Sequence, residues 1–258
     1  MGNRSIYYLY IQFGDSKQKE GLARIEKFHR KNFNKFNMRV LIVDNKYDRK
    51  NIFIEYTNDI VKIAGDNENR EFSAYDLAVR SAKHLFNVHE EDVVIIANDT
   101  FFTHYGDEYL EKFNKKRIRA CIKENAILGH IDKFPKDVTL FDLSFQEWIR
   151  TSFFLTKFSV LNKIGPLAIP WNDQLLFSGV TKPFFSPQAA LSENYKKYLS
   201  YWLFDFENLV SDFPYEWHSK KPLNEQNVGE FRGKVRSILA EHYFSARAQR
   251  LGIPLLSL

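Results

Sequence analysis

Short apolar runs alternate with helical patterns along the first half of the chain. Four of these runs are expected to form strands, at residues 4–13, 38–43, 59–64 and 92–97. The last is a near-continuous Val/Ile run, which is typical of a central strand in a parallel sheet. Apolar residues also recur at helical spacing, most clearly over residues 72–86. This alternation predicts an α/β fold of Rossmann-like type, with a mostly parallel central sheet flanked by helices.

The second half of the chain has a less regular pattern. Short strands are expected at residues 126–130 and 151–155, and short helices at residues 158–164 and 192–204. A long helix is expected over residues 227–251, because apolar residues recur along one of its faces. The second half therefore predicts two more strands followed by a mainly helical end.

The length of the chain suits one α/β domain with an appendage. It has 258 residues, of which 44% are apolar, enough to bury a sizeable core. No repeat or low-complexity linker divides it. We expect the main domain over residues 1–185 and a helical C-terminal extension that packs on it over residues 186–258.

Charge and cysteine content limit the classes of function. The net charge is +5, but the basic residues are dispersed and no nucleic-acid-binding motif occurs, so nucleic acid is not an expected partner. The single cysteine, Cys121, excludes an intramolecular disulfide. The chain begins with a strand pattern instead of a signal peptide, and no apolar run is long enough for a membrane span. A cytoplasmic protein is expected.

Polar residues follow each of the four strands predicted in the first half. They are Gly14-Asp15, Asp44-Asn45, Gly65-Asp66-Asn67 and Asn98-Asp99-Thr100. Ligands of open α/β sheets bind at the carboxyl ends of the strands, so these residues are expected to share one site. Taken singly, each Asp or Asn has the alternative of a turn or a helix cap. Asp99 is the strongest candidate to bind Mn²⁺ or Mg²⁺, which would bridge it to a diphosphate.

These strand ends resemble those of bacterial GT-A glycosyltransferases of the family-2-like type, similar to polysaccharide and rhamnan-synthesis transferases. Asp44-Asn45 resembles the strand end that contacts the nucleotide, and residues 98–100 resemble the Asp-x-Asp signature with one carboxylate kept. Residues 65–75 resemble a loop that leads into a helix beside the nucleotide, and residues 149–155 resemble the strand after the acceptor-facing loop. The resemblance covers roughly residues 4–180 and implies a GT-A-like catalytic domain.

The resemblance implies a nucleotide-sugar-dependent transferase, such as a hexosyltransferase of cell-surface polysaccharide synthesis. Its acceptor would be a hydroxyl group of a glycan or of a lipid-linked molecule. The residues expected to contact the nucleotide-sugar, with Asp99 also as the metal ligand, are Asp44, Asn45, Asn69, Arg70, Asn98, Asp99 and Arg150. Surface ion pairs are the alternative for the two arginines.

Transfer to a hydroxyl group needs a base that takes its proton. Asp173 is favoured because Asn172-Asp173 stands where the family carries a Glu-Asp pair. Glu193 and Asp132 are the reserves, and a helix N-terminus is the alternative role for Asp173. Inversion or retention at the anomeric carbon stays open.

Other classes of protein are less consistent with the sequence. No GxGxxG, GxxxxGK[ST] or GxSxG motif occurs, which disfavours Rossmann dehydrogenases, P-loop NTPases and serine hydrolases. The reduced acidic signature keeps open a non-catalytic, GT-A-like subunit that binds sugar in an assembly complex. The C-terminal part, with Trp202, Trp217 and Lys220-Lys221, has peripheral membrane contact as an alternative to packing on the domain. The oligomeric state is open.

Overall fold

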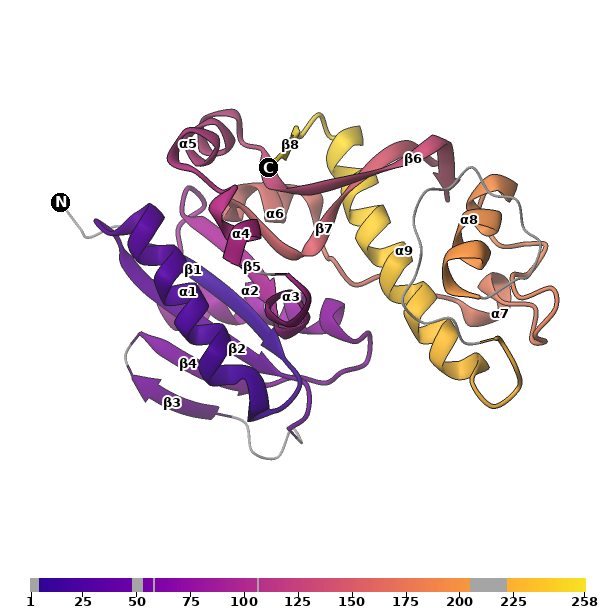
Figure 1. Cartoon of the computed structure of the whole chain (residues 1–258), viewed down its shortest axis with the longest axis horizontal. Coiled ribbons are helices and arrows are strands. Elements are labelled where there is room, and N and C mark those ends of the chain that lie inside the picture. The colour runs from indigo at the N-terminus through magenta and orange to yellow at the C-terminus, as the bar shows by residue number, and fades with distance from the viewer. Residues whose placement is uncertain (1–4, 48–52, 58, 106, 205–221) are drawn as a thin grey trace.

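The protein folds around one eight-stranded sheet with helices on both faces (Figure 1). The computed structural model describes residues 5–47, 53–57, 59–105, 107–204 and 222–258. The strands are β1 (Ser5–Gln12), β2 (Asn37–Asp44), β3 (Phe53–Thr57), β4 (Ile60–Ala64), β5 (Val93–Asn98), β6 (Ile127–Leu140), β7 (Leu143–Lys157) and β8 (Leu255–Ser257). The helices are η1 (Asp15–Lys17), α1 (Gln18–Phe33), α2 (Glu71–Phe86), α3 (Asp99–His104), α4 (Asp107–Glu111), α5 (Lys115–Glu124), α6 (Phe158–Ile164), α7 (Asp173–Leu176), α8 (Glu193–Leu203) and α9 (Val228–Arg250).

The centre of the sheet is parallel. The strand order is β3-β4-β2-β1-β5-β7-β6-β8, and β1 pairs in parallel with β2 on one side and with β5 on the other. β2 pairs in parallel with β4, whereas β7 runs antiparallel to both β5 and β6. The α/β fold class predicted from the sequence is confirmed, and the carboxyl ends of β1, β2, β4 and β5 lie at the same edge.

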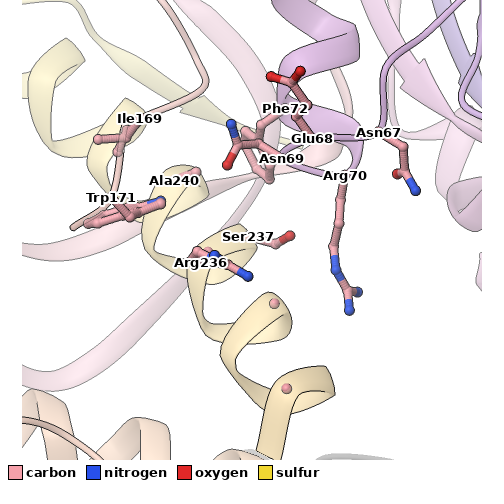
Figure 2. Close-up of a pocket in the computed structure, with 12 residues that line it drawn as sticks. Asn67, Glu68, Asn69, Arg70, Phe72, Ile169, Trp171, Arg236, Ser237 and Ala240 are labelled. Atoms are coloured by element: carbon pink, nitrogen blue, oxygen red, sulfur yellow. The ribbon is translucent and has the colours of Figure 1, made fainter. Parts of the chain in front are cut away.

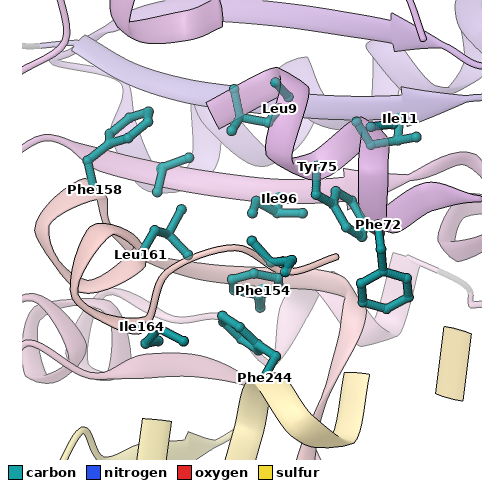
Figure 3. Close-up of a cluster of buried hydrophobic side chains, with 14 of the residues drawn as sticks. Leu9, Ile11, Phe72, Tyr75, Ile96, Phe154, Phe158, Leu161, Ile164 and Phe244 are labelled. Atoms are coloured by element: carbon teal, nitrogen blue, oxygen red, sulfur yellow. The ribbon is translucent and has the colours of Figure 1, made fainter. Parts of the chain in front are cut away.

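Two apolar layers sandwich the central strands, and β1 contributes to both by alternation. Tyr7, Leu9 and Ile11 face the layer beneath α2, α6 and α9, whereas Tyr8 and Tyr10 face the layer that includes α1 and α3. Such two-sided burial explains why these strands are nearly continuous apolar runs. Figure 3 shows the first layer, in which side chains from β1, β5 and β7 meet those of α2, α6 and α9.

A further, mostly aromatic cluster lies where β6 and β7 extend beyond the end of β5. Trp148 packs on Phe134 with ring centroids 4.5 Å apart, and both contact the ring of His242 from α9. The Tyr195 hydroxyl, from α8, lies 2.5 Å from Nδ1 of His242. Burial lowers the pKa of His242 to about 3, so this ring is neutral. Side chains of α9 belong both to this aromatic cluster and to the apolar layer of the sheet core, so α9 connects the two.

The structure differs from the sequence-based elements mainly in the second half. The strand predicted at residues 126–130 is the beginning of a much longer strand, β6, and that predicted at residues 151–155 lies near the end of the similarly long β7. Polar and apolar residues alternate along these extensions because one face packs on the aromatic cluster. β3 was not predicted. Trp217 and Lys220-Lys221 lie outside the described residues, and no described helix is both long and apolar enough to cross a bilayer.

Candidate functional site

A pocket of about 330 Å³ opens at the carboxyl ends of β1, β2 and β5, and we call it the strand-end pocket. Its place follows from the parallel pairing, because these adjacent strands end at one edge of the sheet. The lining residues are Ile11, Gln12, Phe13, Asn45, Asn67, Arg70, Glu71, Asn98, Asp99 and Thr100. Four of the residues predicted from the sequence, Asn45, Arg70, Asn98 and Asp99, therefore share one pocket.

The end of β5 is fixed by side-chain hydrogen bonds. Oδ1 of the buried Asn98 accepts from the backbone N–H of Phe101 at 2.9 Å and so caps α3. Its Nδ2 donates to the Tyr75 hydroxyl at 3.1 Å. Asp99 is half-buried and accepts from the backbone N–H of Phe13 at 3.0 Å, which ties β5 to β1. Asn98 thus serves as scaffold, and Asp99 places a carboxylate on the pocket lining.

The end of β2 carries a carboxylate of a different kind. Asp44 is fully buried and accepts from four donors: the Gly14 and Lys46 backbone N–H groups, Gln12 Nε2 at 2.7 Å and Lys62 Nζ at 2.8 Å. Burial alone would raise the pKa of Asp44, but these hydrogen bonds hold it below its usual value. Asp44 does not line the pocket: its buried carboxylate is engaged by donors from the end of β1, the loops after β1 and β2, and β4.

Asn45, the residue after Asp44, lines the strand-end pocket, whereas Asp44 does not. Its Nδ2 donates to the backbone oxygen of Arg70 at 2.9 Å, so the end of β2 also supports the loop before α2. A Cβ atom on Gly65, at the end of β4, would lie 2.0 Å from Asn45 Oδ1. Glycine is therefore required at this close approach.

The loop between β4 and α2 holds two non-glycine residues at positive φ. Asn67 has a φ of 53° and Arg70 a φ of 52°. Such geometry is uncommon outside glycine and is concentrated at ligand-binding loops. Among the described residues, Arg70 forms no ion pair with a carboxylate, and its guanidinium lies beside Gly233 of α9. The loop therefore holds a cation at the pocket that is open to an anionic ligand.

Two further carboxylates lie close to this edge of the sheet. Glu71 lines the pocket, and burial raises its pKa, with the negative charge of Asp99 adding to the shift. Glu241 of α9 lies just beyond the end of β5. Its Oε2 accepts hydrogen bonds from the backbone N–H and from Oγ1 of Thr151, both at 2.7 Å. Thr151 lies on the stretch of β7 that is not paired with β5. Burial raises the pKa of Glu241 to about 7.

A second pocket, of about 260 Å³, lies between the β4–α2 loop and α9, and we call it the α9 pocket. Figure 2 shows Asn67 and Arg70 on one side of it, Ile169 and Trp171 on the other, and α9 between them. The remaining lining residues are Glu68, Asn69, Phe72, Gly229, Gly233, Arg236, Ser237 and Ala240. Asn67 and Arg70 line both pockets, so the two adjoin each other.

The other predicted residues lie outside the strand-end pocket. Asp132 and Arg150 bind each other, with Arg150 Nη2 2.9 Å from Asp132 Oδ1, and His130 Nε2 lies 3.2 Å from the same oxygen. Burial raises the pKa of Asp132, but the hydrogen bonds from His130 and Arg150 outweigh it and lower the pKa. Glu193 is exposed and pairs with Lys196 at the start of α8.

Asp173 and Asn69 belong to the neighbourhood of the α9 pocket. Asn69 lines this pocket, and Asp173 pairs with the lining residue Arg236, whose Nη1 lies 3.2 Å from Oδ1. The side chain of Asn172 caps the short helix α7, which begins at Asp173. Asp173 therefore lies at a helix N-terminus, the alternative role considered for it from the sequence.

A metal ion at the strand-end pocket would have few protein ligands. Among the described residues, no group of three or more His, Cys, Asp or Glu side chains is arranged to hold a metal. Mg²⁺ is commonly bound through one or two carboxylates together with substrate phosphates and water. Asp99 fits that mode, with Glu71 as the other carboxylate on the pocket lining.

Comparisons with known proteins leave the family open. No family model matches the chain, and no curated protein matches it. Among solved structures, a 4-diphosphocytidyl-2C-methyl-D-erythritol synthase is similar with a TM-score of 0.38 and 9% sequence identity, over 62% of this chain and 77% of that one. A likeness this low does not bear on function, which is argued below from the site itself.

Several residues at the two pockets were not singled out as site residues from the sequence. Gln12 has the signal of a polar residue at the end of an apolar strand. Gly229 and Gly233 are four residues apart and so lie on one face of α9, which was a detectable pattern. Glu241, which lies near the strand-end pocket but lines neither pocket, gave no local signal, because its hydrogen-bond partner is Thr151, 90 residues earlier in the chain.

Proposed function

We propose that this protein is a glycosyltransferase that moves a sugar from a nucleotide-diphosphate donor to a hydroxyl group of a glycan or lipid-linked acceptor. The observation that carries the proposal is the strand-end pocket, which brings Asp99 and Arg70 together at the carboxyl ends of parallel strands. Open α/β sheets bind nucleotides at this position. A carboxylate and an arginine are also the residue types that hold a metal ion and a diphosphate.

The donor's diphosphate is expected beside Arg70, whose planar guanidinium donates two parallel hydrogen bonds to phosphate oxygens. Mn²⁺ or Mg²⁺ would be held by Asp99 together with phosphate and water, and it would offset charge on the leaving diphosphate. The nucleoside is expected on the side of β1 and β2, where Asn45 and the exposed ring of Phe13 line the pocket. Asp44 supports this arrangement from below by fixing the backbone at Gly14.

The reaction forms a bond between the acceptor oxygen and the anomeric carbon and breaks the bond from that carbon to the diphosphate oxygen. The diphosphate leaves with the bonding electrons, and the hydroxyl proton passes to a base. Glu71 is the best-placed base, since its side chain lines the pocket and burial raises its pKa, which strengthens its affinity for a proton. Asp173, favoured by chain order, is the second choice because Arg236 already pairs with it.

The test is a thermal-shift screen with UDP-, GDP- and dTDP-sugars, with and without Mn²⁺, followed by measurement of donor hydrolysis. Preferential binding to the folded state raises the melting temperature. We expect at least one donor to give a shift in the wild type and none in Arg70→Met. Arg80→Met is the matched control, because Arg80 is an exposed arginine on α2 that lines neither pocket. A full shift in Arg70→Met, or no shift with any donor, would contradict the proposal.

Donor binding without hydrolysis or transfer would favour the second candidate, a non-catalytic sugar-binding subunit. The observation in its favour is that residues 98–100 keep a single carboxylate. Hydrolysis of a nucleotide-sugar that depends on Glu71 would exclude it.

A further inference from the structure

We propose that the α9 pocket is the acceptor site and that it binds a carbohydrate ring. The inference rests on the proposed function and assigns its second substrate to a named set of residues. It is carried by three observations: the pocket adjoins the strand-end pocket, its lining is apolar on one side and polar on the other as a sugar is, and α9 lines it mainly with small residues.

Continuity comes from the strained loop before α2. Asn67 and Arg70 line both pockets, so a ligand in the α9 pocket lies next to one in the strand-end pocket. Transfer needs the acceptor hydroxyl within contact distance of the donor's anomeric carbon. Arg70 at the boundary, with a positive φ, would be held there between the diphosphate and the acceptor.

The lining of the α9 pocket is apolar on one side and polar on the other. Trp171 stacks on Phe141, with centroids 5.5 Å apart and ring planes 14° from parallel, which fixes its orientation. Ile169 and Ala240 extend this apolar wall. Asn69 and Ser237 bring an amide and a hydroxyl group to the same pocket. A pyranose ring pairs an apolar C–H face with a rim of hydroxyl groups, which matches such a pocket.

The surface of α9 at the pocket is built from small residues. Gly229 and Gly233 lie one above the other, in line with Ser237 and Ala240. A Cβ on Gly233 would come within 3.1 Å of the Arg70 guanidinium, so glycine makes room for that side chain. Nothing lies within 4 Å of a Cβ at Gly229, where a larger side chain would occupy the pocket without displacing protein atoms.

The test fills the pocket with Gly229→Leu. Glu230→Leu is the matched control, because it adds the same side chain one residue further along α9, at an exposed position outside the pocket. The probes are a panel of p-nitrophenyl pyranosides. Their binding is measured by saturation-transfer NMR without donor, and their use as acceptors by the KM for transfer.

We expect Gly229→Leu to lose glycoside binding and to raise the acceptor KM at least tenfold, with the nucleotide-sugar thermal shift unchanged. Glu230→Leu should behave as the wild type in all three measurements. Wild-type affinity for glycosides in Gly229→Leu, no glycoside binding by the wild type, or joint loss of the donor shift in Gly229→Leu would overturn the acceptor assignment. Absence of any donor shift in the wild type would instead overturn the proposed function, and the NMR measurement would still judge the pocket.

Discussion

The ends of β2 and β5 look alike in the sequence, since each carries an aspartate beside an asparagine, but they differ in the fold. At β2 the aspartate, Asp44, is sealed beneath the loop after β1 and bonded to four donors. At β5 the order is reversed: Asn98 is the sealed residue, and Asp99 is on the pocket lining. The residue that continues the buried strand becomes scaffold, and the next one lines the pocket.

The comparison separates stability from function. A buried carboxylate whose oxygens all accept hydrogen bonds fixes backbone positions, and a half-buried carboxylate on a pocket lining can also contact a metal ion or substrate. Substitutions beneath β2 should therefore act mainly on the free energy of unfolding, whereas those at Asp99 should act mainly on binding. Four predictions test this division, from the largest expected effect on stability to the smallest.

Lys62→Met should destabilise the protein by about 3 to 5 kcal/mol, because it leaves the buried Asp44 without its cation. Lys62 is 2% exposed and Asp44 0%. Urea unfolding monitored by circular dichroism measures the difference. Lys133→Met, which removes an exposed lysine paired with Glu147, should have a much smaller effect, because solvent screens an exposed ion pair. Equal effects of the two substitutions would break the comparison.

Glu241→Gln should flatten the dependence of stability on pH. The pKa of Glu241 is about 7 in the folded protein and 4.5 when unperturbed, so its favourable contribution is complete below pH 4.5 and is lost as pH rises through 7. Glutamine mimics the protonated acid and can still accept from Thr151. At pH 8 the variant should be more stable than the wild type by about 1 to 3 kcal/mol.

Urea unfolding at pH 5 and pH 8 measures this difference, with Glu111→Gln at an exposed position on α4 as the control. A decline in stability between these pH values that is as steep in Glu241→Gln as in the wild type would contradict the assignment.

Gly65→Ala should destabilise the protein by about 1 to 3 kcal/mol, through overpacking against Asn45. The added methyl group would meet Asn45 Oδ1 at 2.0 Å and push a lining residue of the strand-end pocket. Gly229→Ala is the control, because its methyl group meets nothing within 4 Å, and it should stabilise α9 by about 0.5 to 1 kcal/mol. Thermal unfolding measures both, and a neutral Gly65→Ala would mean that Asn45 moves freely.

Asp99→Asn should change the free energy of unfolding by less than about 0.5 kcal/mol, because the side-chain oxygen can still accept from the backbone of Phe13. The same unfolding measurement applies. A loss as large as that expected for Lys62→Met would place Asp99 among the structural carboxylates and remove the contrast between the two strand ends.

The sequence predicted the parallel strands and their common edge, because strands that are buried on both faces consist of long apolar runs, as β1, β2 and β5 do. It also predicted that Asn45, Asn98 and Asp99 belong together. These inferences needed only local patterns and the rule that parallel strands end at the same edge.

The parts that the sequence did not reveal depend on contacts between distant residues. Asp44 is buried as an ion pair with Lys62, which lies on the neighbouring strand β4. Asp132 was a candidate base, but Arg150 binds it across the β6–β7 hairpin. Glu241 lies close to the common edge of the parallel strands only because α9 crosses the stretch of β7 beyond the end of β5. No local pattern carries such pairings.

The central claim is that the donor binds at the end of β5 through Asp99. Isothermal titration of the nucleotide-sugar selected by the thermal-shift screen, in the presence of Mn²⁺, tests it most directly. We predict at least a hundredfold weaker binding to Asp99→Asn than to the wild type. Asp142→Asn, at an exposed aspartate paired with Arg250, should leave the affinity unchanged. Wild-type affinity in Asp99→Asn would contradict the account.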